Sequence, residues 1–227
     1  MQTLVCESFE TRTKVRTPAP ILYEGEKSVN QSIIETTRLV IRPFIADDLR
    51  PIHRILDQTF GDGSKVDDAA ALLERQSWLQ WSILSQEWLP KMYQPPYGDR
   101  AIVLKSSDEL IGSVGYVPLL GVFEQIPELR TSAEFSGYAT TEVGLFWVID
   151  LQHQRQGYAT EAAQAMIDHA FKQLRLKRIL ATTEYSNTAS QGVMRKLGMK
   201  ITRNPLPEPE WLQVVGLLEN TDYLNAC

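Results

Sequence analysis

The chain has 227 residues, of which 43% are apolar and 22% charged, and these are values of a folded globular protein. Its formal net charge of -5 argues against a nucleic-acid partner, because such proteins carry a basic balance. No apolar run approaches the ~20 residues that span a bilayer, and Met1–Glu7 lacks the basic start and apolar core of a secretory signal. We therefore expect a cytoplasmic protein without a membrane segment.

The ends of the chain carry little chemistry. Cys6 and Cys227 fit no metal or redox spacing, so we expect no metal site. Residues 1–35 are polar, and Pro18 and Pro20 interrupt any regular element there. We predict an N-terminal extension over 1–35, either a tail or an arm that shapes the site or a dimer, followed by one domain over 36–227.

Hydrophobic periodicity and turn residues divide this domain into strands and helices. Asp47 and Asp48 open the first helix, where acidic side chains suit the helix dipole, and Pro90 is expected to end the second. The order is typical of a mixed α/β sheet with helices on its faces. We expect strands at 38–44, 101–105, 110–117, 140–149, 178–184, 200–203 and 211–218, and helices at 47–56, 67–89, 159–172 and 189–196.

Two segments stand out in this order. Between residues 118 and 138 the pattern breaks down, which indicates an inserted loop with a short helical turn near Glu124. Loops of this length are often functional. The second helix carries Trp78, Trp81 and Trp88, which indicate either core packing or the wall of an acceptor cleft.

The stretch Gln154–Ala163 joins the strand at 140–149 to the following helix and reads Gln-Arg-Gln-Gly-Tyr-Ala-Thr-Glu-Ala-Ala. A glycine turn before a helix lets backbone N–H groups converge on an anion, helped by the positive end of the helix dipole. The stretch is not a P-loop, because no Gly-Lys-Ser/Thr closes it. It is not a dinucleotide fingerprint either, because Gly157 is its only glycine. The pattern predicts an anion site and leaves the anion open.

Together with Asn187-Thr-Ala-Ser190 and Lys196-Leu-Gly-Met199, this stretch resembles the GNAT N-acetyltransferase superfamily. The string Gly-Tyr-Ala-Thr-Glu-Ala and the opening Glu35-Thr-Thr-Arg-Leu-Val-Ile-Arg-Pro43 are similar to its ribosomal-protein-alanine N-acetyltransferase branch. The resemblance implies the GNAT fold, which has a central, mixed and mostly antiparallel sheet with helices on both faces. The central strand would splay from its neighbour at a bulge.

The resemblance also implies that the anion is the pyrophosphate of acetyl-CoA, and it implies no metal. Backbone groups of the central strand would bond the pantetheine arm as an added strand does. Asn187 and Ser190 match family positions that face this arm and the thioester sulfur. The residues so implied in cofactor binding are Trp147, Val148, Ile149, Arg155, Gln156, Gly157, Tyr158, Ala159, Thr160, Asn187 and Ser190.

An amine attacks a thioester only when neutral, so we expect a base for its proton and an acid for the leaving thiolate. Glu142 resembles the family glutamate, although two more residues separate it from Gly157 than in the branch, an offset of about 7 Å along a strand. Glu184 is the rival base. Met194 stands where many family members have a tyrosine acid, so Ser190 is the predicted acid.

Two other side chains rank lower as catalysts. Tyr116 is a weaker choice of acid, since a tyrosine on a strand is more often a half-buried sheet residue. His153, at the entrance to the glycine loop, is read as a surface residue.

The resemblance implies an enzyme that moves an acetyl group from acetyl-CoA to a primary amine by direct attack in a ternary complex. The amine would belong to a protein N-terminus or to a small molecule, and the enzyme would be a monomer or a homodimer. Two other readings stay open. One is a catalytically idle acyl-CoA-binding or sensor module, and the other is a nucleotide-binding protein with a variant phosphate loop.

Overall fold

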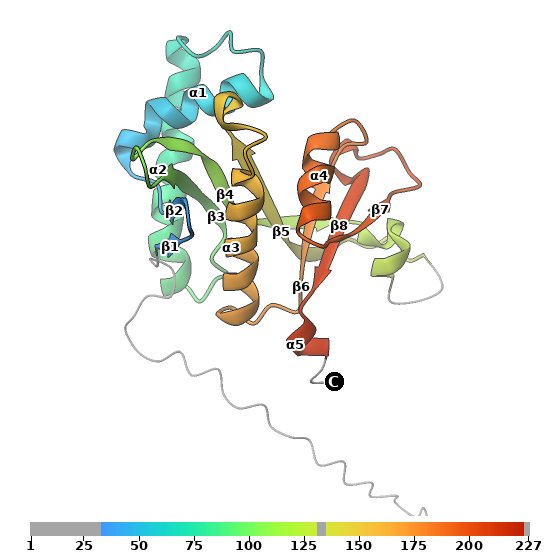
Figure 1. Cartoon of the computed structure of the whole chain (residues 1–227). Helices are drawn as coiled ribbons and strands as arrows, with labels where there is room; N and C mark the ends of the chain where they lie inside the picture. Colours follow the sequence, from blue (N-terminus) through green and yellow to red (C-terminus); the bar gives the residue numbers. More distant parts are fainter. Residues whose placement is uncertain (1–32, 131–134, 225–227) are drawn as a thin grey trace, which may run out of the picture.

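The computed structural model of the chain describes residues 33–130 and 135–224, and Figure 1 shows their arrangement. Both cysteines and most of the expected N-terminal extension lie outside these residues. The strands are β1 (Ile34–Glu35), β2 (Leu39–Arg42), β3 (Gly98–Leu104), β4 (Leu110–Gly121), β5 (Thr140–Ile149), β6 (Arg178–Thr183), β7 (Lys200–Arg203) and β8 (Val214–Glu219). The α-helices are α1 (Leu49–Phe60), α2 (Ala69–Lys91), α3 (Tyr158–Lys172), α4 (Thr188–Lys196) and α5 (Thr221–Leu224), and short 3₁₀ helices cover 46–48, 123–125, 127–129, 151–153 and 210–212.

One eight-stranded sheet runs through the domain in the order β1-β2-β3-β4-β5-β6-β8-β7. All neighbours are antiparallel except β5 and β6, which are parallel and share a single paired position, Gly144 with Leu180. The predicted splay at the central strand is therefore confirmed. The pairing of β4 with β5 runs through ten positions in constant register, so the expected bulge is absent from that pair. The register shifts instead in the pairing of β3 with β4, between Ile102 and Val103, where Ile111 of β4 is the extra residue.

Helices cover both faces of the sheet, as expected (Figure 1). α3 packs on β2, β4 and β5, and α4 packs on β6, β7 and β8. On the other face, α1 packs on β4 and β5, and α2 packs on β3. Strand side chains alternate between the two faces. On β5, Leu145 and Ile149 join the core under α3, whereas Val148 joins the core under α1. Each such buried side chain contributes about 1.5–3 kcal/mol.

Residues 118–130 form more regular structure than expected. β4 continues through Pro118 to Gly121, and these residues pair with β5. The 3₁₀ helix at 123–125 confirms the helical turn expected near Glu124. Apolar side chains beyond the strand end form a third core cluster with residues of β6, β8 and the helix at 210–212. Its members are Phe123, Ile126, Leu129, Leu180, Leu212 and Val215. The expected loop is thus wrong for these residues, because they cover the face of β6 and β8 opposite α4.

The three tryptophans of α2 do not share one environment. Trp78 is half-buried and meets the ring of Phe44 edge-on at 5.6 Å between centroids, as core packing predicts. Trp81 is 56% exposed and Trp88 is 50% exposed, so the expectation of core packing is wrong for these two.

Other boundaries shift by a few residues. Pro90 lies in the last turn of α2, which ends at Lys91. β8 begins at Val214, because residues 210–212 form a 3₁₀ helix. Ile34 and Glu35, assigned to the extension by the sequence, pair with β2 as β1. Within the part of the chain that is described, no helix is both long and apolar enough to cross a membrane.

Candidate active site

The turn between β5 and α3 brings the predicted pyrophosphate-binding residues together. Arg155 and Gly157 have φ angles of 60° and 86°, and Gly157 is the N-cap of α3. Glycine adopts this left-handed conformation without strain. The first N–H groups of α3, from Tyr158 to Thr160, have no acceptor within the helix and can bind an anion. Their contact with the cofactor stays a prediction.

The start of this turn is held by Asp150, whose side chain is almost fully buried. One carboxylate oxygen accepts the N–H of Gln152 at 3.0 Å, and the other accepts Nη2 of Arg54, on α1, at 2.5 Å. Burial alone would raise the pKa of Asp150, but the bonds from Gln152 and Arg54 outweigh it and hold that pKa below its usual range. Gln154 Nε2 also donates to the carbonyl of Ile149 at 3.0 Å. The strand end and the turn are therefore one bonded unit.

The end of the turn is held by Arg38, just before β2. Arg38 donates from Nε to Glu161 at 2.7 Å and from Nη1 to the carbonyl of Gln156 at 3.0 Å. The backbone N–H of Arg38 and the hydroxyl of Thr36 donate to the other oxygen of Glu161, at 2.9 and 2.6 Å. The Arg38 guanidinium also lies over the Tyr158 ring, 4.3 Å from its centroid. Arg38 therefore fixes the turn from outside, a role that the sequence did not reveal.

A third contact reaches the turn from the β3–β4 hairpin. His153 Nε2 lies 3.7 Å from a carboxylate oxygen of Glu109, and the His153 side chain is only 16% exposed. His153 thus lies at the surface but is partly covered by Glu109 and by the nearby ring of Tyr158.

Beyond Gly144, β5 and β6 separate and leave a gap between them. The edge of β5 that faces this gap lacks a strand partner. The N–H of Asp150 donates to Ile111 of β4 at 2.8 Å. Bonded positions alternate along an antiparallel pair, so Val148 also bonds β4, whereas the N–H and C=O of Trp147 and the N–H of Ile149 face the gap. An extended pantetheine arm would find these groups there, as an added strand would.

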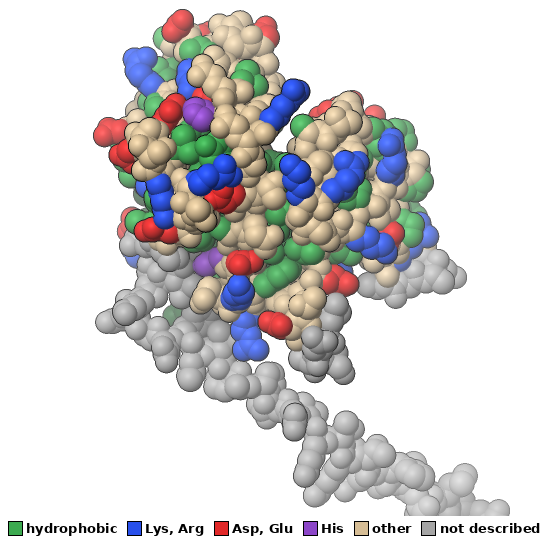
Figure 2. All heavy atoms as spheres, in the orientation of Figure 1, with side chains coloured by type: hydrophobic (Ala, Val, Ile, Leu, Met, Phe, Trp, Pro, Cys, Tyr) green, Lys and Arg blue, Asp and Glu red, His purple; other side chains and the backbone are tan. Residues whose placement is uncertain are grey.

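The molecular surface is hollowed between α3 and α4. Figure 2 shows this hollow with Lys and Arg side chains on both of its sides. Arg155, on the turn between β5 and α3, is exposed. A concave surface with positive charge at its rim favours an anionic ligand.

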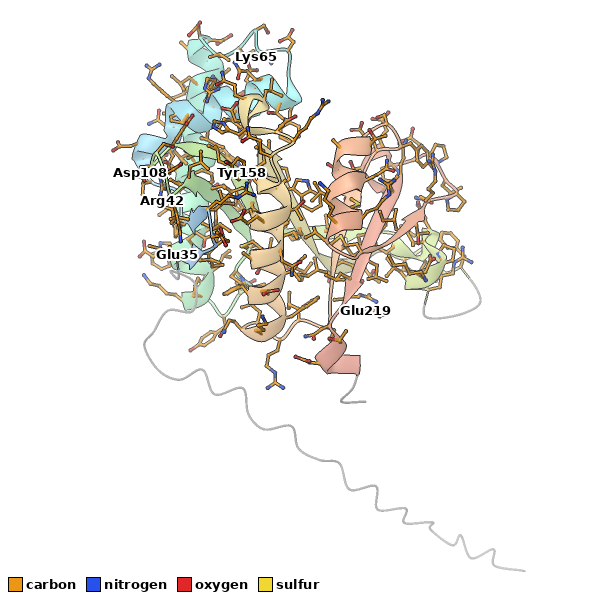
Figure 3. All side chains as sticks on the ribbon, viewed as in Figure 1. Glu35, Arg42, Lys65, Asp108, Tyr158 and Glu219 are labelled. Atoms are coloured by element: carbon orange, nitrogen blue, oxygen red, sulfur yellow. The ribbon has the colours of Figure 1, made fainter. Side chains whose placement is uncertain are left out.

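Glu142 lies near the other end of β5, where β5 and β6 are still in contact. Both of its carboxylate oxygens accept hydrogen bonds from Arg178 of β6, one of them from Nε at 2.9 Å. The hydrogen bonds to Glu142 raise the pKa of Arg178. In Figure 3, Glu219 of β8 marks this end of the sheet, and Tyr158 marks the end with the turn between β5 and α3. A cavity of about 530 Å³ is lined there by Tyr97, Thr141, Glu142, Val143, Leu176, Lys177, Arg178 and Glu219.

A family model described as an acetyltransferase (GNAT) domain matches residues 38–200. The chain belongs to the GNAT acetyltransferase family. The Bacillus subtilis protein named "Uncharacterized N-acetyltransferase YnaD" is 28% identical over 171 residues, which cover 74% of this chain and 82% of that protein. The match to this family and to proteins named N-acetyltransferases confirms the predicted enzyme class.

Solved GNAT structures confirm the fold. The ribosomal-protein-S5-alanine acetyltransferase of Vibrio fischeri matches with a TM-score of 0.57 at 19% identity, over 85% of this chain and 98% of that one. RimL, a ribosomal L7/L12 alpha-N-protein acetyltransferase solved with coenzyme A, matches with a TM-score of 0.53 at 14% identity, over 82% and 96% of the two chains.

The string Asn187-Thr-Ala-Ser190, which carries part of the GNAT resemblance, forms the start of α4. The side chain of Asn187 accepts the N–H of Ser190 at 3.0 Å and so caps the helix. Ser190 is half-buried, and its hydroxyl makes no hydrogen bond to the described residues. Met194, at the position of the GNAT tyrosine, is completely buried in the core under α3 and α4. Met194 therefore has a packing role, and the assignment of Ser190 as the acid stays a prediction.

The lower-ranked candidates lie in different surroundings. Tyr116 is 2% exposed, its hydroxyl donates to the carbonyl of Met166 at 2.6 Å, and burial raises its pKa. Its hydroxyl is thus held beneath α3. Glu184 directly follows β6 at the open end of the gap and is exposed, with the hydroxyl of Ser186 at 3.3 Å from its carboxylate.

Proposed function

We propose that this GNAT enzyme transfers an acetyl group from acetyl-CoA to a primary amine by direct attack in a ternary complex. The observation that carries the proposal is the turn from Arg155 to Thr160, with its free helix N–H groups, next to the unpaired edge of β5. Phosphate binds such helix starts, and extended amide chains bind such strand edges. GNAT enzymes use acetyl-CoA, and the ligand carries both groups in one molecule.

The chemical step is attack of the neutral amine on the thioester carbonyl. A C–N bond forms, the C–S bond breaks, one proton leaves the amine and one is taken up by the thiolate. Acetyl-CoA supplies the activated acetyl group, and the chain supplies proximity, a proton acceptor and a proton donor. The backbone N–H of Trp147 or Ile149 faces the gap and would stabilise negative charge on the carbonyl oxygen.

Glu142 remains our proposed base and Ser190 our proposed acid. Each carboxylate oxygen of Glu142 accepts one bond from Arg178 and keeps a second lone pair, through which it would accept the proton of the amine or of a water molecule. Glu184 is the alternative base, because it is exposed and lies at the open end. The free hydroxyl of Ser190 at the start of α4 supports its assignment.

The acceptor amine is proposed to belong to a protein N-terminus or to a small molecule. Similar folds named for ribosomal-protein acetylation support the first choice, but at 14–19% identity they show the fold alone. A cytoplasmic location also stays a prediction. A panel of N-terminal peptides and small amines separates the two acceptor classes.

A catalytically idle acyl-CoA-binding module is the second candidate. Two observations favour it, namely that Met194 is buried in place of a proton donor and that Arg178 engages Glu142. A thiol-release assay with acetyl-CoA and the amine panel distinguishes the two functions. Turnover on any amine supports the transferase, whereas CoA binding without turnover supports the module. Preference for ATP or NAD over CoA in calorimetry contradicts both.

A further inference from the structure

The outer face of α2 is apolar, although it points away from the sheet. Leu79, Ser82 and Gln86 on the inner side are buried, so the direction of the helix is fixed. A row of large exposed apolar side chains on the outer side of a helix marks an interaction site. The large outward side chains are Leu73, Trp81, Leu84, Trp88 and Met92, which are 64%, 56%, 52%, 50% and 54% exposed.

We propose that this face forms a homodimer in which the α2 helices of two copies pack antiparallel about a two-fold axis. The outward positions, with Ser77 included, are 73, 77, 81, 84, 88 and 92. Their spacing is four, four, three, four and four residues, which reads the same in both directions. A two-fold axis brings one patch onto itself, so the patch has to be self-complementary. An antiparallel copy of this helix meets that condition.

The axis of such a dimer passes between Trp81 and Leu84. Ser77 then lies level with Trp88 of the second copy, so a small side chain leaves room for a large one. Tryptophans near the centre of an interface carry much of its binding energy. Glu74, Gln80 and Glu87 flank the apolar face and are exposed, as expected of a polar rim, and the ammonium of Lys91 lies over the ring of Trp88, 4.7 Å from its centroid.

The available area fits a stable dimer. The five large side chains expose roughly 600 Å² per chain, estimated from areas typical of such side chains. The polar rim raises this toward the ~800 Å² that each partner contributes to an interface of standard size. α2 carries two acidic and two basic residues, so two copies meet without net repulsion between the helices. The exposed area and the charge balance of α2 are therefore compatible with a second copy on this face.

Sedimentation velocity of the full chain tests the interface. We expect the wild type at the mass of two chains, and Leu84→Glu and Trp88→Glu at the mass of one, each with an unchanged far-UV circular dichroism spectrum. Leu120→Glu is the matched control, because Leu120 is 68% exposed but lies on β4, and it should remain a dimer. A wild type that stays monomeric at micromolar concentration overturns the proposal. A dimer that survives both α2 variants also overturns it.

Disulfide trapping tests the antiparallel direction, after replacement of Cys6 and Cys227 by Ser. In the antiparallel dimer, Leu84 of one copy lies level with Trp81 of the other. The two Leu84 positions are then three residues, or about 4.5 Å, apart along the helix axis, so Leu84→Cys should cross-link under mild oxidation. Two copies of Leu73 lie about 29 Å apart, beyond the ~7 Å reach of a disulfide, so Leu73→Cys should not. Cross-linking of both variants indicates parallel helices and overturns the proposal. Cross-linking of neither variant overturns it as well.

Discussion

The two ends of β5 are held by opposite means. At the end that leads to α3, ion pairs from Arg54 and Arg38 hold Asp150 and Glu161, and the N–H groups from Tyr158 to Thr160 have no acceptor within the helix. At the other end, Glu142 itself forms an ion pair with Arg178. At the first end, side chains serve the backbone that would bind the ligand. At the second end, the side chain proposed to react is the one that is already engaged.

This difference teaches that the two halves of the proposed site depend on different things. Cofactor affinity should depend on the shape of the turn and on the distant residues that hold it. Acetyl transfer should depend on whether the amine or a water molecule can reach the carboxylate of Glu142 beside Arg178. Substitutions at the two ends can therefore separate binding from turnover.

Gly157→Trp, at the turn, has the largest expected effect. A Cβ at this φ of 86° is strained and lies 3.3 Å from Nη2 of Arg38, and the indole would cover the N–H groups of α3. We expect CoA affinity in calorimetry to fall by at least ~100-fold. Gly63→Trp is the control, since Gly63 has a similar φ of 78° but lies before α2. Equal losses in both variants would show that strain, rather than the turn, is responsible.

Glu142→Gln, at the other end, should lower kcat about 100-fold, as removal of a general base does, with little change in CoA affinity. Arg178→Met is its partner variant and retains the carboxylate, so it should keep most of the turnover. The measurement is steady-state kinetics between about pH 6 and 9. Turnover of Glu142→Gln at the wild-type level over this range would move the base to Glu184 or to solvent. Equal losses in both variants would assign the pair a structural role.

The sequence predicts the fold well wherever local patterns decide. The strand at 140–149 and the strand at 200–203 have the predicted bounds, because alternation and flanking turns define them. The order of Phe123, Ile126 and Leu129 was not predictable, because their burial depends on a face of β6 and β8 that forms only in the folded chain. The core packing expected of Trp81 and Trp88 was wrong for the same reason, since the sequence pattern shows that a residue is apolar but not what covers it.

The candidate site likewise divides into features that the local sequence predicts and features that only the fold shows. The glycine turn could be recognised from ten consecutive residues, and its geometry agrees with an anion site. Arg38 was missed, although it and Glu161 stand in the two strings that carry the family resemblance. They are 123 residues apart, and only the fold shows that they bond. Arg178 was missed likewise, because its bond to Glu142 exists only where β5 and β6 lie side by side.

Arg38→Ala should weaken CoA binding about tenfold, because Gln156 and Glu161 lose a charge-assisted link. Binding of acetyl-pantetheine, which lacks the pyrophosphate, should not change. Arg38→Lys should also weaken CoA binding, because an ammonium cannot form the same fork. Arg50→Ala is the control, since Arg50 is exposed on α1. Equal losses for CoA and acetyl-pantetheine would show that Arg38 acts on the whole domain instead of the turn.

Glu161→Gln should have the smallest effect, and that effect should depend on pH. Burial alone would raise the pKa of Glu161, but the bonds from Thr36 and Arg38 outweigh it and hold the pKa below the ordinary 4.5. The unfolded chain thus takes up the proton first, so the stabilisation is complete above about pH 4.5 and disappears as the pH falls through the lower folded value.

We therefore expect Glu161→Gln to lower the free energy of unfolding by about 1 kcal/mol near pH 7, and by less near pH 3, in urea titrations. Asp168→Asn is the control on the same helix, because Asp168 pairs with Lys172 and both side chains are about half exposed or more. Its expected loss is about 0.3 kcal/mol. If both variants lose the same amount at every pH, Glu161 is an ordinary surface partner. The Arg38–Glu161 and Arg178–Glu142 ion pairs at the two ends of β5 would then differ in position and not in strength.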